Sequence, residues 1–375
     1  LTQDVRVKDR LLLDDGLIEL VVEDKTATEL YCRVLHGGSL GERKGINLPG
    51  TPLSIPSITD KDRSDLEFGI QQGVDYVALS FVRSAKDCLD AKQLIEHTAN
   101  KVGAEKPPLI AKIEKAEALR ELDAILEIAD GIMVARGDLG IETSTESVPV
   151  YQKEMIRKAN LIGKPVITAT QMLQSMIENP RPTRAEASDV ANAILDGTDA
   201  VMLSGETASG AFPVEAVKTM DRIVRFTEDA VDREVFGKMN RALSAISQHT
   251  GSYNRALAEA AVFAAEEIGS PIILVFTEGG KMARRVSSLS PRQKIVAFTY
   301  VQETYRRLAA IWGINSYMMG IGGASDRLLT HADQMLLRLQ LALRGTTIVM
   351  VAGNLSGIPA SNIVKLHRVG DFVEA

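Results

Sequence analysis

The chain has 375 residues, 43 basic and 49 acidic side chains, and a formal net charge of −6. Its 45% apolar and 25% charged residues are typical of a soluble globular protein and exclude a disordered or collagen-like chain. A net-acidic chain without a Lys/Arg-rich run is not expected to bind nucleic acid, and no run of about 18 apolar residues is present that would span a membrane. Its two cysteines form neither a disulfide framework nor a zinc cage, so we expect a cytoplasmic location. The length predicts two or three domains.

Residues 1–53 are predicted to form a β-rich module. Apolar runs are broken by Asp15–Gly16 and Gly37–Gly38, a pattern typical of hairpin turns. The runs are Arg10–Leu13, Leu17–Val22 and Glu29–Leu35. The chain starts at Leu1 without the charged and apolar regions of a signal peptide, and we expect that it begins in the middle of a domain.

Residues 54–228 show strands that alternate with helices. Thr59 is a predicted N-cap, acidic residues follow it in the first helical turn, and Gly73 ends the helix. The predicted strands that follow are 74–81, Leu109–Ile113, Ile132–Ala135, Val166–Ala169 and Ala200–Leu203. The predicted helices after them are Ala85–Thr98, Ala116–Ile128, Val150–Leu161, Arg184–Leu195 and Pro213–Glu228. Repeated βα units predict a parallel sheet covered by helices.

Residues 229–375 are predicted to form a second α/β domain. The polar segment Asp229–Gly251 is the expected boundary region. The elements expected after it are a helix at Ala256–Ile268, strands at Pro271–Phe276, Lys294–Thr299 and Thr346–Gly353, and helices at Glu303–Ile311 and Asp326–Leu343.

Polar side chains follow the predicted parallel strands, at the edge where α/β folds bind ligands. Lys112 and Glu114 are two residues apart, so both point to one side of their strand, and Asp138 follows the next strand. Two carboxylates from neighbouring strands can chelate Mg²⁺, which completes its shell with water and substrate oxygens. A lysine beside that ion can neutralise a transferring phosphoryl group or a developing enolate.

The next two strand ends add groups for an anion. Gly137 follows Arg136 and lets backbone N–H groups approach a ligand, and Thr170 offers a hydroxyl. Taken singly, the Lys-x-Glu pair is more often solvated or structural, and a Gly-Asp pair is more often part of a turn. Three adjacent strand ends with complementary groups favour catalysis, provided that the sheet is parallel.

Other polar segments are weaker candidates. Asp14–Gly16 is most simply a hairpin turn, and Arg43–Gly45 is by default a solvated loop. Asn179–Glu186 suits a rigid loop, a subunit contact or a ligand clamp, and Thr277–Lys281 resembles an anion-binding turn in which Glu278 opposes the anion. The five histidines show no metal-ligand spacing.

Several long motifs resemble those of pyruvate kinases. They are GVDYVALSFVRSA at 73–85, PLIAKIEKAEAL around Lys112, DGIMVARGDLGIE at 130–142, GKPVITATQM at 163–172, and the run from NPRPTRAEASDV to FPVEAV at 179–217. Further matches extend from DDGLIEL and GERKGINLPG to FTEGGKMAR and ETYRRLAAIWG, so the resemblance covers essentially the whole chain.

The resemblance implies a TIM (β/α)₈ barrel that is interrupted by a small β-rich lid and followed by an α/β regulatory domain. In the family, the first three barrel strands and the front half of the lid come before the position of Leu1. It also implies phosphoryl transfer from phosphoenolpyruvate to ADP, giving pyruvate and ATP, in a homotetramer. Closure of the lid would exclude water and prevent hydrolysis of the phosphate.

Site roles can be carried over by motif. Glu114 and Asp138 would bind the essential Mg²⁺, and Lys112 would bridge the transferring phosphate and stabilise the enolate. The backbone N–H groups of Gly137 and Asp138, with the Thr170 hydroxyl, would bind the substrate carboxylate. The implied catalytic side chains are Lys112, Arg136 and Thr170, with Lys44 of the lid contacting the nucleotide. K⁺ is a candidate second cofactor. In the family, its ligands precede the position of Leu1, as do an Arg that contacts phosphate and a His that contacts the nucleotide.

Two alternatives to a complete pyruvate kinase stay open at this point. A Mg²⁺-dependent lyase or aldolase of the TIM type, acting on pyruvate enolate, would share the carboxylate pair but need no nucleotide lid. A non-catalytic truncated paralogue would account for the absent first strands. We expect this chain to be inactive alone, because five βα units cannot close an eight-stranded barrel and would leave an unpaired edge strand.

The loop TEGGKM bears on regulation. Family members activated by fructose 1,6-bisphosphate carry hydroxyl-rich phosphate loops here, whereas Glu278 repels phosphate, and Gly280 and Met282 offer no hydroxyl. We therefore expect a sugar monophosphate or nucleotide effector, or none.

Overall fold

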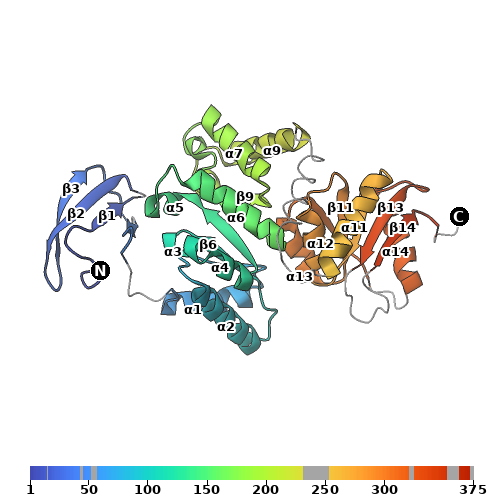
Figure 1. Cartoon of the computed structure of the whole chain (residues 1–375), viewed down its shortest axis with the longest axis horizontal. Helices are drawn as coiled ribbons and strands as arrows, with labels where there is room; N and C mark the ends of the chain where they lie inside the picture. Colours follow the sequence, from blue (N-terminus) through green and yellow to red (C-terminus); the bar gives the residue numbers. More distant parts are fainter. Residues whose placement is uncertain are drawn as a thin grey trace. The chain divides into compact units, whose positions relative to one another are not determined.

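Figure 1 shows the computed structural model, which describes residues 1–14, 16–42, 45–51, 57–230, 253–320, 325–352 and 363–371. The chain divides into two compact units. The first comprises Leu1–Ala159 and Val166–Arg225, and the second comprises Asn160–Pro165 and Phe226–Ala375. The finer division at residues 53 and 228 stays a prediction. Among the described residues, no helix combines the length and the apolar character that crossing a membrane requires.

The β-rich segment of the first unit is an antiparallel sheet in the order β3-β2-β1-β4. Its strands are β1 (Arg10–Leu13), β2 (Ile18–Lys25), β3 (Leu30–His36) and β4 (Ile46–Asn47). The predicted hairpin is confirmed, because Leu13 pairs with Ile18 and Gly16 adopts a φ of 84°, which glycine reaches without steric cost. One face buries an apolar cluster of Val5, Leu11, Val22 and Leu48.

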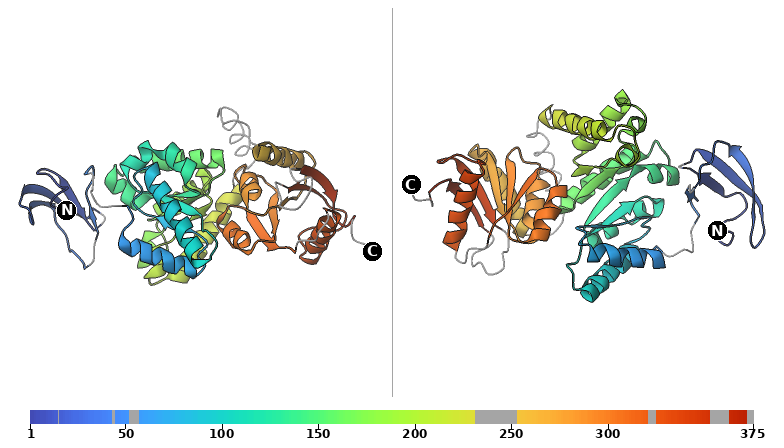
Figure 2. Two further views of the ribbon diagram at one scale, coloured as in Figure 1. Left: turned by 90° about the horizontal axis from the view of Figure 1, so that it is seen from below. Right: turned by 180° about the vertical axis from the view of Figure 1, so that it is seen from behind.

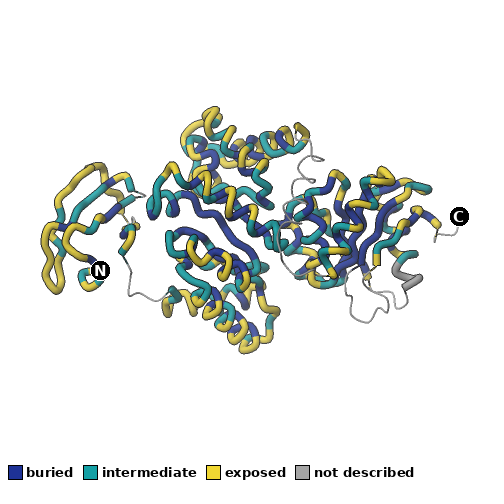
Figure 3. Tube along the Cα trace, in the orientation of Figure 1, coloured by how far each residue is buried: buried dark blue, intermediate teal, exposed yellow. Residues whose placement is uncertain are grey.

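The remainder of the first unit holds five parallel strands in the order β5-β6-β7-β8-β9. They are β5 (Val77–Leu79), β6 (Leu109–Ile113), β7 (Gly131–Ala135), β8 (Val166–Ala169) and β9 (Ala200–Val201). Every residue of β7 is buried, and Figure 3 shows the middle strands of this sheet in dark blue between more exposed helices. The predicted parallel sheet is therefore confirmed.

Helices cover this sheet, and Figure 2 shows the blue-to-teal α1 and α2 at one end of it and the yellow-green α7 and α9 at the other. The helices are α1 (Asp60–Gln71), α2 (Ala85–Val102), α3 (Ala116–Arg120), α4 (Leu122–Ile128), α5 (Arg136–Glu142), α6 (Val148–Ile162), the 3₁₀ turn η1 (Gln174–Ile177), α7 (Arg184–Asp196), α8 (Gly205–Ala208) and α9 (Pro213–Ala230). The single helix expected at 116–128 is broken in two at Glu121. Helix α5 was not expected, because Arg136–Asp138 had been assigned to a strand end.

Capping residues explain where the longer helices begin and end. Thr59, Ser84 and Thr183 each accept a hydrogen bond from the backbone N–H three residues later and form a capping box with the acid at that position. Gly103 ends α2 and Gly197 ends α7 in the left-handed conformation that glycine favours.

The second unit is built on a five-stranded sheet in the order β12-β11-β10-β13-β14. The strands are β10 (Ile272–Phe276), β11 (Lys294–Thr299), β12 (Ile314–Met318), β13 (Thr347–Ala352) and β14 (Ile363–Arg368). The helices are α11 (Tyr253–Glu267), α12 (Lys281–Ser287), α13 (Gln302–Arg307), η2 (Leu308–Ala310) and α14 (Ser325–Arg338). Strand β14 pairs antiparallel to β13, and apolar cores lie on both faces of the sheet. Strands β12 and β14 were not expected from the sequence.

Candidate active site

The carboxyl ends of the middle strands lie side by side in the parallel sheet. Leu79 of β5 is in register with Ala111 of β6, so the residues that follow β5 lie beside the end of β6. The last residue of β7, Ala135, is in register with Ala169 of β8. The polar residues predicted to form the site follow directly from these strand ends.

Lys112 and Glu114 form an ion pair at the end of β6, in which the carboxylate is buried and the lysine is 26% exposed. The Lys112 Nζ lies 2.7 Å from Glu114 Oε1, and the Glu114 side chain is 1% exposed. Lys112 also donates to Ser80 Oγ at 2.9 Å, and the backbone N–H of Phe81 donates to Glu114 Oε2 at 2.6 Å. The expected placement of both side chains on one side of the strand is thus confirmed.

The second oxygen of this carboxylate fits a metal ligand. Among the described residues, the buried Glu114 Oε1 contacts the Lys112 ammonium at 2.7 Å as an ion pair and accepts no aligned hydrogen bond. A buried carboxylate oxygen without a donor is rare unless another group satisfies it. No cluster of three or more His, Cys, Asp or Glu ligands occurs in the part of the chain that the structure describes. The Glu114 carboxylate suits Mg²⁺, which needs one or two carboxylates and completes its shell with other oxygens.

Asp138 occupies the first turn of α5, next to the end of β7, and is partly exposed. A carboxylate in this position is favoured by the positive end of the helix dipole. The structure thus places Asp138 just after β7, the strand that neighbours β6, and Glu114 just after β6, as the sequence predicted.

Thr170 and Gly137 contact one another across β7 and β8. The Gly137 N–H donates to Thr170 Oγ1 at 2.9 Å, and this hydroxyl donates to the Ala169 carbonyl at 2.7 Å. The anion donors predicted from the sequence therefore lie together, but they are bonded to each other.

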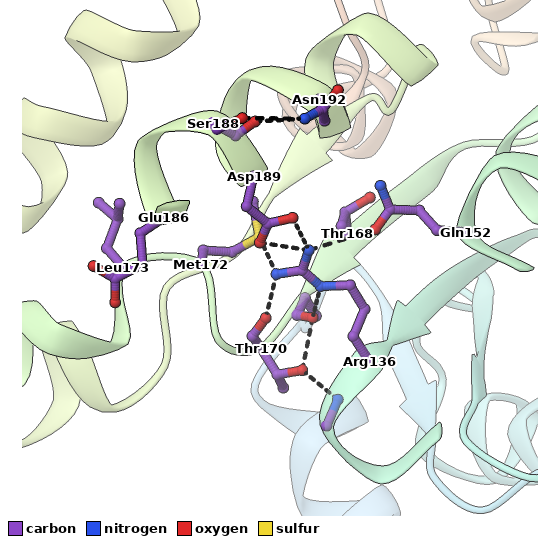
Figure 4. A network of polar contacts seen from close by, with 12 residues as sticks. Arg136, Gln152, Thr168, Thr170, Met172, Leu173, Glu186, Ser188, Asp189 and Asn192 are labelled. Carbon is purple, nitrogen blue, oxygen red and sulfur yellow. Dashed lines mark hydrogen bonds and ion pairs between the residues drawn. The ribbon is translucent and has the colours of Figure 1, made fainter. Parts of the chain in front are cut away.

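Arg136 is buried rather than open to a ligand. Its side chain is 8% exposed and ends in the polar network of Figure 4, where Asp189 of α7 and Gln152 of α6 face the guanidinium. Sequence reasoning missed both partners. Gln152 lies at helical spacing from the buried Val148 and Met155, and a polar residue on such an apolar stripe is the signal that would have indicated a buried contact.

A second buried ion pair flanks the site. Lys115 Nζ donates to Glu142 Oε1 at 2.5 Å, with side chains 11% and 3% exposed, and lies 5.8 Å from the Phe81 ring centroid. Lys115, Ser80 and Phe81 also line a cavity of about 740 Å³ beside β5 whose other walls are mostly apolar. The cavity shares these residues with the site but does not include its carboxylates. Lys44, the predicted nucleotide contact, lies outside the described residues.

Comparisons with known proteins identify close resemblances over both units. A family model described as "Pyruvate kinase, barrel domain" matches residues 1–217, and one described as "Pyruvate kinase, alpha/beta domain" matches residues 255–367. The pyruvate kinase of Geobacillus stearothermophilus is 46% identical over 378 residues and that of Bacillus licheniformis 44% over 377. These matches cover all of this chain but 62% and 63% of the relatives. A crystal structure of a pyruvate kinase from Cryptosporidium parvum superposes with a TM-score of 0.89 at 37% identity, covering 98% of this chain and 74% of that one.

Proposed function

Because the chain belongs to the pyruvate kinase family, we propose that the whole protein transfers the phosphoryl group of phosphoenolpyruvate to ADP, giving pyruvate and ATP. The observation that carries this proposal is the Lys112–Glu114 ion pair at the end of β6, in which the ammonium lies 2.7 Å from Oε1 of the buried carboxylate. Phosphoryl transfer depends on positioning and charge neutralisation, and both groups supply these.

Glu114 and Asp138 are the proposed ligands of Mg²⁺. When bound, the ion supplies positive charge for the phosphoryl and enolate oxygens of the substrate. The Lys112 ammonium is held by Ser80 Oγ at 2.9 Å and by Glu114, so it is fixed before the substrate arrives. An ammonium oriented in this way stabilises charge that develops on the transferring group without further reorganisation.

Thr170, with the backbone N–H groups of Gly137 and Asp138, is the proposed site for the substrate carboxylate. The 2.9 Å contact between Gly137 N and Thr170 Oγ1 supports this, because it brings a donor and a hydroxyl to one point. We further propose that Lys44 contacts the nucleotide. Use of K⁺, assembly as a homotetramer, a cytoplasmic location and the division at residues 53 and 228 are proposed from family membership.

The family matches do not favour the two alternatives. A lyase or aldolase would need no α/β domain of the pyruvate kinase type, yet residues 255–367 match that domain. A non-catalytic paralogue would be free to lose the Lys112–Glu114 pair, which is formed here. The inactivity of the isolated chain stays a prediction.

A coupled assay of ATP formation from phosphoenolpyruvate and ADP tests the proposal on the whole protein. We expect Mg²⁺-dependent ATP formation in the wild type, and a need for at least about tenfold more Mg²⁺ in Glu114→Gln. Glu105→Gln changes an exposed carboxylate in the same way and should leave the Mg²⁺ requirement unaltered. Absence of ATP, with pyruvate released from a larger acid instead, would favour the lyase and reject the kinase.

A further inference from the structure

The backbone at Thr170 is strained. Thr170 has a φ of 65° and Gln171 a φ of 54°, directly after β8. The left-handed region is rarely occupied by residues other than glycine, and a β-branched threonine there is an outlier. Such strain persists where neighbouring groups hold the backbone in place, and it is concentrated at functional sites.

Arg136 holds both peptide groups that flank Thr170. Its Nε donates to the Ala169 carbonyl at 3.3 Å, and its Nη2 donates to the Thr170 carbonyl at 2.6 Å. These carbonyls belong to the peptide bonds before and after Thr170. The guanidinium therefore fixes the orientation of the residue that presents Oγ1 to Gly137 N.

The remaining donors of Arg136 are also used. Nη1 donates to Asp189 at 2.7 Å and to Gln152 Oε1 at 3.5 Å, and Nη2 also lies 2.7 Å from Met172 Sδ. A guanidinium carries five N–H donors, and each has an acceptor within the protein. None is left over for a substrate phosphate, which argues against a catalytic role for Arg136.

We propose that Asp189 is a positioning residue for the carboxylate of phosphoenolpyruvate. Asp189 supplies the counter-charge that orients the buried guanidinium, Arg136 holds the strained Thr170 backbone, and Thr170 Oγ1 is thereby held at the carboxylate site (Figure 4). This inference rests on the proposed function. It assigns to Arg136 and Asp189 an effect on substrate binding without a contact to the substrate.

The two substrates should respond differently to a change at Asp189. Asn at this position keeps the shape of the side chain but removes the charge that faces Arg136. We expect Asp189→Asn to raise the KM for phosphoenolpyruvate about tenfold or more, since hydrogen bonds to charged groups are the stronger ones. The KM for ADP should stay unchanged, because Thr170 is proposed to bind the carboxylate and not the nucleotide.

The experiment measures both KM values and kcat by coupled assay on the whole protein, for the wild type, Asp189→Asn and Asp189→Glu. Restoring the charge with Glu should recover part of the affinity for phosphoenolpyruvate. The matched control is Asn192→Ala on the same helix, where the amide donates to the Ser188 carbonyl at 2.9 Å and does not reach Arg136. This control should behave as the wild type.

Arg136→Lys gives an independent test if Asp189→Asn does not fold, as judged by circular dichroism. Lysine keeps the charge but lacks the planar fork that bonds both carbonyls, so the KM for phosphoenolpyruvate should rise similarly. An active wild type whose variants keep the wild-type KM, or raise both KM values equally, would overturn the inference and leave the proposed function standing. A wild type that forms no ATP would overturn both.

Discussion

Replacing Lys112 with Met isolates the charge at the centre of the site. The methionine retains an apolar stem of similar length but leaves the Glu114 carboxylate, 1% exposed, without its ammonium partner. Removing one partner of a buried ion pair destabilises a protein by about 3–5 kcal/mol. The Phe81 N–H, 2.6 Å from Glu114 Oε2, remains as a donor, so we expect the lower end, about 3 kcal/mol.

Mg²⁺ should reverse most of this loss if Glu114 is a metal ligand. A ligand at about 100 times its Kd adds about 2.7 kcal/mol to the stability of the state that binds it. We therefore expect urea unfolding of Lys112→Met, followed by circular dichroism, to shift toward the wild-type midpoint when MgCl₂ is added. In the activity assay, kcat should fall by about 100-fold or more with little change in the KM for phosphoenolpyruvate, because the charge acts on the transferring group.

The control is Lys86→Met, which breaks an exposed ion pair with Asp90 on α2. Its unfolding midpoint should stay near that of the wild type with and without Mg²⁺. A Lys112→Met protein that loses stability but gains nothing from Mg²⁺ would show that Glu114 does not bind the ion. Turnover near the wild-type rate would refute the role of Lys112.

Two further predictions concern the first turn of α7 and the turn between α8 and α9. Burial raises the pKa of Glu186, but hydrogen bonds donated by Ser175 and Thr183 outweigh it and hold the pKa below the ordinary 4.5. The stabilisation by the ionised Glu186 is therefore full above the unfolded-state pKa and is lost as the pH falls through the folded-state pKa. We expect the difference in unfolding free energy between the wild type and Glu186→Gln to shrink in acid. A difference that stays constant across the pH range would contradict this prediction. A Cβ added at Gly210 would lie 2.6 Å from the Glu206 carbonyl oxygen, so Gly210→Ala should lower the unfolding free energy by about 1–3 kcal/mol in a urea titration. The control is Gly279→Ala, because a Cβ there would meet nothing within 4 Å. An equal loss of stability in the control would point to a general effect of alanine and not to the contact at Gly210.

Much of the fold was predictable because its signals are local. The apolar runs from 109 to 135 predicted β6 and β7, and Thr59 marks a helix boundary through hydrogen bonds within a few residues. Strand β14 was missed because it joins β13 as an antiparallel edge strand, and its pairing partner is specified by packing rather than by its own short pattern.

The candidate site was likewise predictable where its signals are local and not where its contacts are distant in sequence. Lys112 lies on β6 and Glu114 directly follows that strand, so their alternation alone placed both side chains on one side, where they form an ion pair. The family resemblance implied a catalytic role for Arg136, because its motif is visible in the sequence. Its hydrogen-bond partner Asp189 is 53 residues away on another helix, and no local pattern links them.

The sequence by itself determined the alternation of strands and helices, the residues at each strand end and the family. These properties depend on periodicity, capping residues and motifs, which are patterns among residues close together in the sequence. Only the tertiary structure decided that the Arg136 guanidinium donates its hydrogen bonds to acceptors within the protein and that Thr170 is held in a left-handed conformation. Both depend on how α6, α7 and β8 pack together, because a buried donor bonds with whichever acceptors the folded chain brings within reach.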